Sequence, residues 1–151
     1  MDLTQRLGRR LHDLRSAAGL SLDALAQKSG VSRSNISLIE RGQSSPTAVV
    51  LDKLSSALGV SVASMFEAGD APAAPSPLAR VADQPVWQDP ASGYVRRNVS
   101  PPGASPLQLV DVIFPPGQRV QFETAARDTE IHQLLWMIDG AMEIGHGSSR
   151  W

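Results

Sequence analysis

The stretch from Leu22 to Ile39, LDALAQKSGVSRSNISLI, contains the pattern that decides the fold of the first half of this chain. Ala26 lies four residues before Gly30, and Ile36 lies six residues after it. Two short helices that cross closely need a small residue at their contact, and the tight turn between them needs a glycine that can take a positive φ. The second helix is then held against the first by apolar side chains, namely Leu25, Val31, Ile36 and Ile39. The stretch predicts two short helices joined by a tight turn.

Helix signals continue on both sides of this stretch. Leucines at three- and four-residue steps predict a first helix from about residue 3 to residue 18. Each predicted helix has a serine at its start, a glycine at its end, or both. The serines are Ser21, Ser32, Ser45 (with Pro46 at the first helical position) and Ser61, and the glycines are Gly19, Gly30, Gly42 and Gly59. The last short helix ends near Phe66, so residues 1–66 are expected to form a five-helix bundle.

Composition divides the chain into two unlike halves. Residues 1–66 carry eight Lys or Arg against five acids, whereas residues 67–151 carry six Arg against ten acids. Ten of the 11 prolines follow residue 66. We therefore expect a basic helical domain over 1–66, a Pro/Ala-rich linker over 67–80 and a second domain over 81–151.

Several function classes are excluded or disfavoured at this stage. The chain has no cysteine, which removes disulfides, thiol nucleophiles and cysteine-bound zinc. No apolar run approaches the roughly 18 residues of a membrane span, and the first residues lack the apolar core of a signal peptide. A soluble cytoplasmic protein without a membrane partner is expected.

The second half has the pattern of short strands separated by turns. Candidate strands lie in GYVRRNV (93–99), LQLVDVIF (107–114), RVQFE (119–123) and IHQLLWMIDGAMEI (131–144). Pro115-Pro116-Gly117 predicts a sharp turn, and Asp139-Gly140 predicts a hairpin. This pattern is typical of an all-β sandwich or barrel.

The first half resembles the phage-repressor-like (XRE) helix-turn-helix family, with a lambda-repressor-like bundle. The resemblance covers about residues 5–66 and is carried by ALAQKSGVSRSNISLIERGQSSPT followed by LDKLSSALGVSVASMF. It implies a transcription regulator that binds double-stranded DNA. One departure is Leu22, because the family often has glutamine at that position and uses it for a phosphate contact.

Members of such a family insert the start of the second helix of the motif into the major groove. The side chains expected to meet base edges there are Ser32, Arg33, Ser34 and Asn35, with Ser37 one turn further. Arg33 is the main candidate, because its forked guanidinium can donate two hydrogen bonds to a guanine. The side chains expected to contact phosphates are Ser21, Arg41 and Ser44. The first helix also carries arginines on its polar side. For each of them a functional role and a place on a merely solvated face are equally open interpretations; they are Arg6, Arg9, Arg10 and Arg15.

The second half resembles the beginning of a cupin over about residues 93–147, through Pro116-Gly117 and HQLLWMIDGAMEI. The metal-binding positions of that family correspond here to Glu123, Ala125 and Gln133, and alanine cannot bind a metal. Glu130 and His132 lie nearby, but side chains around an apolar pocket are the favoured interpretation, with no metal or other cofactor. A full barrel needs strands beyond Trp151, so we expect an incomplete, truncated jelly-roll region or one completed by a second chain.

These observations predict an α + β protein of two domains that acts as a sequence-specific regulator and not as an enzyme. The β domain would sense a small-molecule effector or mediate dimerisation, and a homodimer is expected because one small reading head buries little DNA surface. Two alternatives remain at this stage. The protein could be a cupin-type metal-dependent enzyme, or an antitoxin-like module that binds another protein.

Overall fold

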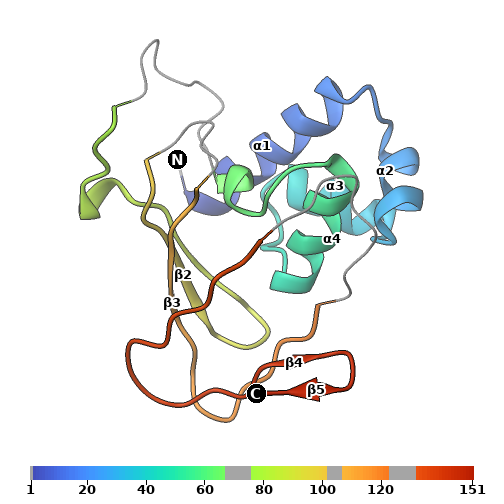
Figure 1. The fold of residues 1–151 in the computed structure, drawn as a ribbon. Coiled ribbons are helices and arrows are strands. Elements are labelled where there is room, and N and C mark those ends of the chain that lie inside the picture. Colours follow the sequence, from blue (N-terminus) through green and yellow to red (C-terminus); the bar gives the residue numbers. More distant parts are fainter. Residues whose placement is uncertain (1, 67–75, 102–106, 123–131) are drawn as a thin grey trace.

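The computed structural model of the chain describes residues 2–66, 76–101, 107–122 and 132–151. Its first part consists of the helices α1 (Leu3–Ala17), α2 (Leu22–Ser29), α3 (Arg33–Glu40) and α4 (Ala48–Leu58), which lie together in Figure 1. All four predicted stop glycines have a positive φ, between 66° and 71°. The predicted caps of α2 and α3 are also confirmed, because the Ser21 and Ser32 hydroxyls accept the backbone N–H groups of Ala24 and Asn35.

Two details of the predicted bundle are wrong. The fifth helix is not an α-helix but the four-residue 3₁₀ helix η1 (Ala63–Phe66), so this part contains four α-helices. The fourth helix begins at Ala48 with Thr47 as its cap, two residues later than Ser45 and Pro46 predict. At this start the Thr47 hydroxyl accepts the N–H of Val50 at 3.3 Å, and the distant side chain of Asp89 accepts the N–H of Ala48.

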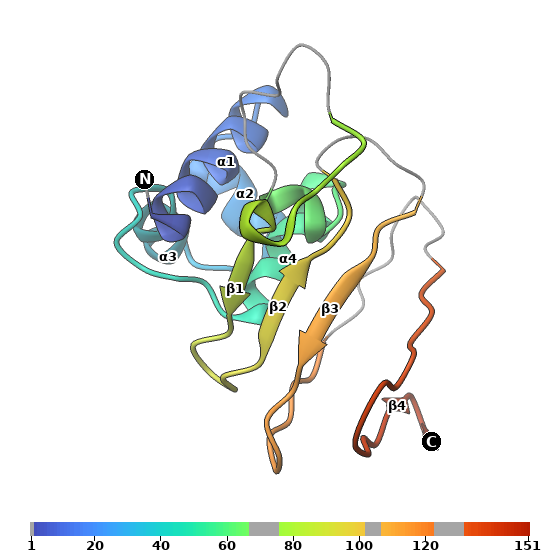
Figure 2. The ribbon, with the colours of Figure 1, turned by 90° about the vertical axis from the view of Figure 1, so that its left-hand side faces the viewer.

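The second part contains a small antiparallel sheet. Its strands are β1 (Val86–Gln88), β2 (Val95–Asn98) and β3 (Val110–Ile113), in the order β1-β2-β3, with the 3₁₀ helix η2 (Val81–Asp83) before them. Figure 2 shows the three strands side by side next to the helices. The register places Trp87 opposite Arg96, and Arg96 opposite Val112. The strands predicted in 93–99 and 107–114 are therefore confirmed.

The remaining strand predictions fail within the described residues. Residues 119–122 and 132–144 form no strand, and Asp139-Gly140 lies in a bend that joins no hairpin strands. The chain instead makes a short hairpin from β4 (Gly145–His146) and β5 (Ser149–Arg150). The described residues thus contain a small β region and no jelly roll. A strand forms only where a partner edge meets it, and alternating apolar residues do not supply that edge.

The helices and the sheet share one apolar core. Trp87 and Tyr94 are buried in the same cluster as Leu25, Leu51 and Phe66. An aromatic series continues through this core, with ring centroids 6.0 Å apart for Phe66 and Trp87, 5.6 Å for Trp87 and Tyr94, and 5.8 Å for Tyr94 and Phe114. The division at residue 66 stays a prediction, but the sheet packs directly on the helical part.

A buried carboxylate joins the two parts. Asp89 follows β1, and its Oδ1 accepts the N–H of Ala48 at the start of α4 at 3.1 Å. Its Oδ2 accepts the backbone N–H of Ser92 at 3.0 Å and also the hydroxyl of that serine. Burial acts to raise the pKa of Asp89, but the hydrogen bonds from Ser92, Ala48 and Ala91 outweigh it and hold the pKa below its ordinary value.

The lowered pKa of Asp89 predicts a loss of stability in acid. A carboxylate with a depressed folded-state pKa stabilises the fold above its unfolded pKa, about 3.9, and this contribution disappears as the pH falls through the folded-state value. We expect Asp89→Asn to cost about 1–3 kcal/mol at pH 7, because the amide replaces one acceptor by a donor that faces other donors. Urea unfolding at pH 7 and at steps below pH 4 would measure this. The difference between wild type and variant should shrink below pH 4, and a constant difference would contradict the assignment.

Candidate nucleic-acid interface

The turn between α2 and α3 is fixed by hydrogen bonds as well as by its glycine. Gly30 has a φ of 69° and donates its N–H to the carbonyl of Ala26. The buried Ser29 hydroxyl donates to the carbonyl of Leu25 at 2.7 Å and accepts the N–H of Val31 at 3.2 Å. Sequence reasoning missed Ser29, since a serine at the end of a polar helix face gives no signal of burial. Together these bonds set the angle at which α3 leaves α2.

The start of α3 is the exposed end of this motif. Ser32, Arg33 and Ser34 are exposed, whereas Asn35 and Ser37 are half-buried. The opposite side of α3 is buried through Ile36 and Ile39. The predicted base-reading residues therefore lie together on one helix, three of them open to a ligand.

Two of these hydroxyls already have partners. Ser32 Oγ caps α3 by accepting the N–H of Asn35 at 3.3 Å, and it lies 3.2 Å from Ser34 Oγ. Ser32 thus holds the helix start in place. The hydroxyl of Ser34 takes no part in this cap.

Arg33 forms an ion pair on the surface. Its Nε lies 3.1 Å from Oδ1 of Asp23 in α2, and the two side chains are 64% and 77% exposed. A pair this exposed contributes little to stability, so a competing acceptor can replace the carboxylate. The ion pair holds the guanidinium beside the exposed start of α3, where an anionic or hydrogen-bonding ligand can displace Asp23 from it.

The predicted phosphate contacts flank the two helices. Ser21 caps α2 and is exposed, and Arg41 is exposed just after α3, with its Nε donating to the carbonyl of Ser37 at 3.2 Å. Ser44 is half-buried in the following turn. Leu22 packs partly against the core. A leucine side chain cannot hydrogen-bond to a phosphate, which agrees with the expectation that this position does not make the phosphate contact of the family.

An ion pair that sequence reasoning missed holds α3 to α1. Arg15 donates from Nε and Nη2 to the two carboxylate oxygens of Glu40 at 2.6 and 2.9 Å, and from Nη1 to the carbonyl of Leu20 at 2.8 Å. The hydrogen bond to Glu40 raises the pKa of Arg15, against the effect of burial. Arg15 is therefore a structural residue and no part of a solvated face. Its side chain is 13% exposed and that of Glu40 is 9% exposed.

The close approach of α1 to α3 depends on a glycine. A β-carbon at Gly8 would collide with the backbone carbonyl oxygens of Ile39 and Glu40. Another α1 arginine, Arg10, donates from Nε to the carbonyl of Ser64 at 3.1 Å and so connects α1 to η1. Only the exposed Arg6 and Arg9 fit the expected polar face.

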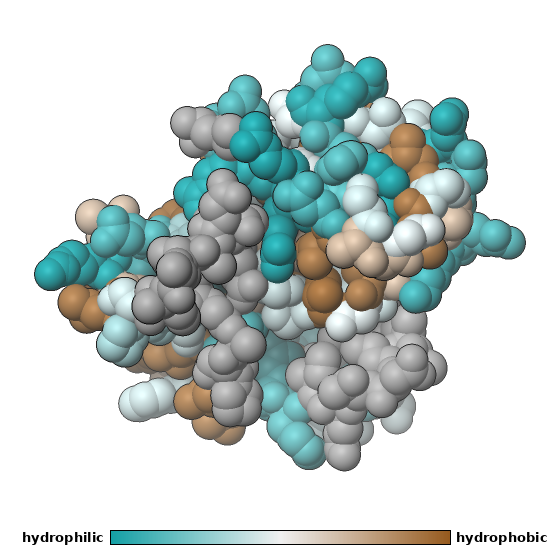
Figure 3. All heavy atoms as spheres, turned by 90° about the horizontal axis from the view of Figure 1, so that it is seen from above, coloured by the Kyte–Doolittle hydropathy of each residue, from teal (hydrophilic) through white to brown (hydrophobic). Residues whose placement is uncertain are grey.

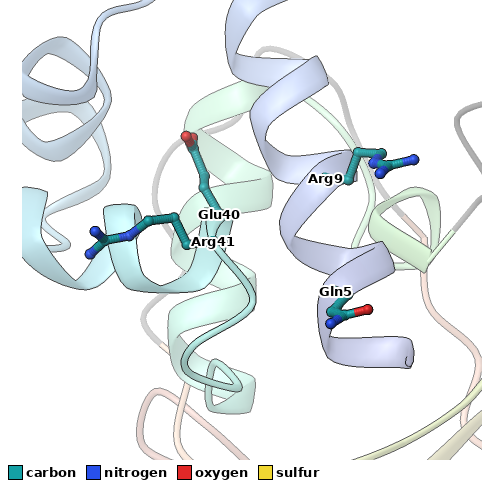
Figure 4. A pocket seen from close by; sticks show the side chains of 4 residues that line it. All are labelled: Gln5, Arg9, Glu40 and Arg41. Carbon is teal, nitrogen blue, oxygen red and sulfur yellow. The ribbon is translucent and has the colours of Figure 1, made fainter. Parts of the chain in front are cut away.

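The end of α3 borders a polar hollow of about 330 Å³ lined by Gln5, Arg9, Glu40 and Arg41. In Figure 4 Arg9 and Arg41 lie on either side of it, one from α1 and one from the end of α3, and their guanidinium groups point away from each other. Seen from above, hydrophilic residues cover most of the helical side of the molecule, with smaller apolar areas between them (Figure 3).

The described residues of the β region contain no metal-binding cluster. No three His, Cys, Asp or Glu side chains of those residues lie close enough together to hold a metal ion. His132 and Gln133 are exposed, whereas Glu123, Ala125 and Glu130 lie outside the described residues. Among the helices of the described part, none combines the length and the apolar character that crossing a membrane requires.

Comparison with known proteins assigns the class that this geometry indicates. A family described as "Helix-turn-helix domain" matches residues 6–82, slightly more than half of the chain. The chain belongs to this helix-turn-helix family.

Two regulators are similar to the chain in sequence. The HTH-type transcriptional regulator SinR of Bacillus subtilis is 40% identical over 62 residues, which cover 40% of this chain and 56% of SinR. An uncharacterized HTH-type transcriptional regulator of Sinorhizobium fredii, y4dJ, is 38% identical over 61 residues, which cover 40% of this chain and 79% of that protein. The chain thus spans about half the length of the SinR proteins that it matches.

Two solved structures are similar to part of the chain. The restriction-modification controller protein C.AhdI of Aeromonas hydrophila is 40% identical, with a TM-score of 0.41, covering 42% of this chain and 96% of that one. SinR in complex with DNA is also 40% identical, with a TM-score of 0.39, covering 40% of this chain and 98% of that one.

Proposed function

We propose that this protein is a sequence-specific DNA-binding transcriptional regulator that reads the major groove with α3. The observation that carries the proposal is the exposed start of α3, where Arg33 and Ser34 project from a helix whose angle is fixed by the α2–α3 turn. A major groove about 12 Å wide admits one such helix. Ser21, Arg41 and Ser44 flank the helix and would bind phosphates, which fixes the position on the duplex without reading sequence. The names of the relatives support regulation as the role.

Arg33→Ala tests this proposal. We expect it to weaken binding to the cognate duplex by about 1–3 kcal/mol, roughly 5- to 150-fold, and to leave binding to random duplexes nearly unchanged. The cognate duplex is first selected from a random pool at two salt concentrations, and affinities are then measured by fluorescence anisotropy.

Lys28→Ala is the matched control, because it removes an exposed positive charge from the neighbouring helix. Its effect on cognate and random duplexes should be equal and small. Equal losses for Arg33→Ala on both duplexes would contradict base reading. Recovery of no motif at either salt concentration would contradict sequence-specific binding as a whole.

The β region is proposed to serve effector sensing or dimerisation, as its resemblance to cupins implies. The β region packs directly on the helices through Trp87 and Asp89, which supports a link between its role and DNA binding by the helices. A homodimer would place two copies of α3 about 34–36 Å apart, one turn of DNA, and would read an inverted repeat. We propose binding and not catalysis as its activity, in the cytoplasm, where a bacterial-type regulator meets DNA.

A further inference from the structure

A negative charge lies on the surface that is proposed to meet DNA. Asp23 is in the first turn of α2, two residues after the cap Ser21, and its side chain is well exposed. Its Oδ1 is 3.1 Å from Nε of Arg33, the main candidate for base reading. DNA carries one negative charge for about every 1.7 Å of its axis, so a carboxylate at this place opposes charge-driven binding to any duplex.

The ion pair of Asp23 with Arg33 does little for the fold. Both side chains are open to water, which screens their attraction. The crossing of α2 and α3 is already set by the turn between them, where the buried Ser29 hydroxyl bonds to both Leu25 and Val31. The main effect of Asp23 therefore falls on the acceptors that Arg33 can bind.

Two kinds of acceptor compete for an exposed guanidinium at a DNA surface. Phosphate oxygens are charged and occur at every step of the duplex, so binding to them carries no sequence information. The major-groove edge of guanine is uncharged and offers the acceptors O6 and N7. A phosphate that approaches Arg33 must displace the Asp23 carboxylate and is repelled by its charge, whereas an uncharged guanine meets much weaker repulsion.

The contact between the two side chains leaves the outer end of the guanidinium available. Nε is the inner nitrogen of an arginine, and Nη1 and Nη2 lie beyond it and carry most of its N–H donors. A bidentate contact with guanine needs two donors, so Nη1 and Nη2 can make it while Asp23 stays at Nε of Arg33. The carboxylate also restricts the long arginine side chain, which reduces the conformational entropy that is lost when it binds a base.

We propose that Asp23 is a positioning residue that determines specificity: it holds Arg33 for guanine and opposes the pairing of Arg33 with phosphate. This inference rests on the proposed function, since it concerns how the same surface of α3 selects its DNA site. Specificity is a difference between two affinities, and a group that repels the wrong acceptor increases that difference. Asp23 lowers the affinity for DNA in general and raises the discrimination between sequences.

Asp23→Ala in the full 151-residue chain tests this role. Affinities for the selected cognate duplex and for random duplexes are measured by fluorescence anisotropy over a series of salt concentrations. We expect random duplexes to bind roughly 3- to 10-fold more tightly, and their slope of log K against log [salt] to steepen by about 0.9, because Arg33 gains a phosphate. Cognate binding should gain less, since Arg33 loses its orientation toward guanine, so the ratio of the two affinities falls.

Asp83→Ala is the matched control, because it removes an exposed carboxylate from η2, outside the helix-turn-helix motif, and should leave the ratio unchanged. Adding Asp23→Ala to Arg33→Ala completes a double-mutant cycle. Without the guanidinium, loss of the Asp23 carboxylate should change the affinities for both duplexes by the same factor. Circular dichroism checks that every variant folds.

Two results would overturn this inference and leave the proposed function standing: an Asp23→Ala variant whose affinities for both duplexes change equally, or a loss of discrimination that persists in the Arg33→Ala background. In both cases the wild type still selects a motif, so the failure concerns Asp23 alone. A wild type that selects no motif contradicts the proposed function, and with it this inference.

Discussion

Trp87→Ala is expected to lower the free energy of unfolding by about 3–5 kcal/mol, because it removes a large side chain from the core shared by the helices and the sheet. Trp87 is buried between Phe66 of η1 and Tyr94 before β2. Its Nε1 makes no hydrogen bond within the described residues. The loss is therefore one of packing, and Trp87→Phe should recover most of it.

The measurement is urea unfolding followed by circular dichroism at 222 nm, which reports on the helices. A single transition at lower urea concentration is expected, since the helices lose a contact although the substitution lies in the sheet. Val86→Ala is the matched control, because Val86 is the preceding residue of β1 and faces outward. An unchanged helical transition in Trp87→Ala would show that the sheet unfolds independently.

Glu40→Ala is expected to lower the free energy of unfolding by about 1.5–3 kcal/mol, since it leaves the half-buried Arg15 guanidinium without its charge-assisted hydrogen bonds. The two side chains of this pair are 13% and 9% exposed, and their bidentate geometry is the strong arrangement for arginine and a carboxylate. A double variant, Arg15→Met with Glu40→Met, should be much less destabilised than either single loss, because no unpaired charge remains.

Asp23→Ala gives the comparison for an exposed pair. It removes the carboxylate beside Arg33, where both side chains are well exposed, and should change stability by less than about 1 kcal/mol. Thermal unfolding of Glu40→Ala, the double variant and Asp23→Ala in the same buffer would rank their stabilities. A Glu40→Ala variant as stable as Asp23→Ala would contradict the role of Arg15 and Glu40 in holding α3 to α1.

Part of the candidate interface could be predicted because it is local. The caps Ser21 and Ser32 and the turn glycine Gly30 act within three or four residues of their partners. The position of Arg33 at the front of the motif follows from the helix it starts. Its pairing with Asp23 could not be predicted, since that depends on how two helices cross.

The failures share one cause, which is dependence on a distant partner. Residues 132–144 have the strand pattern but no pairing in the described structure, and the predicted start of α4 at Ser45 gave way to Thr47. The first N–H of α4 is met by Asp89, 41 residues further along the chain. The two groups are too far apart in the chain for a local sequence pattern to contain both.

The sequence by itself determined α2 and α3 with their serine caps, and the glycines that follow all four α-helices, because propensity, capping and glycine conformation act over a few neighbouring residues. Only the tertiary structure decided that Arg15 pairs with Glu40, that Asp89 closes α4 and that Trp87 joins the sheet to the helical core. Those contacts join residues far apart in the chain. Their free energy depends on burial and distance, which exist only once the chain has folded.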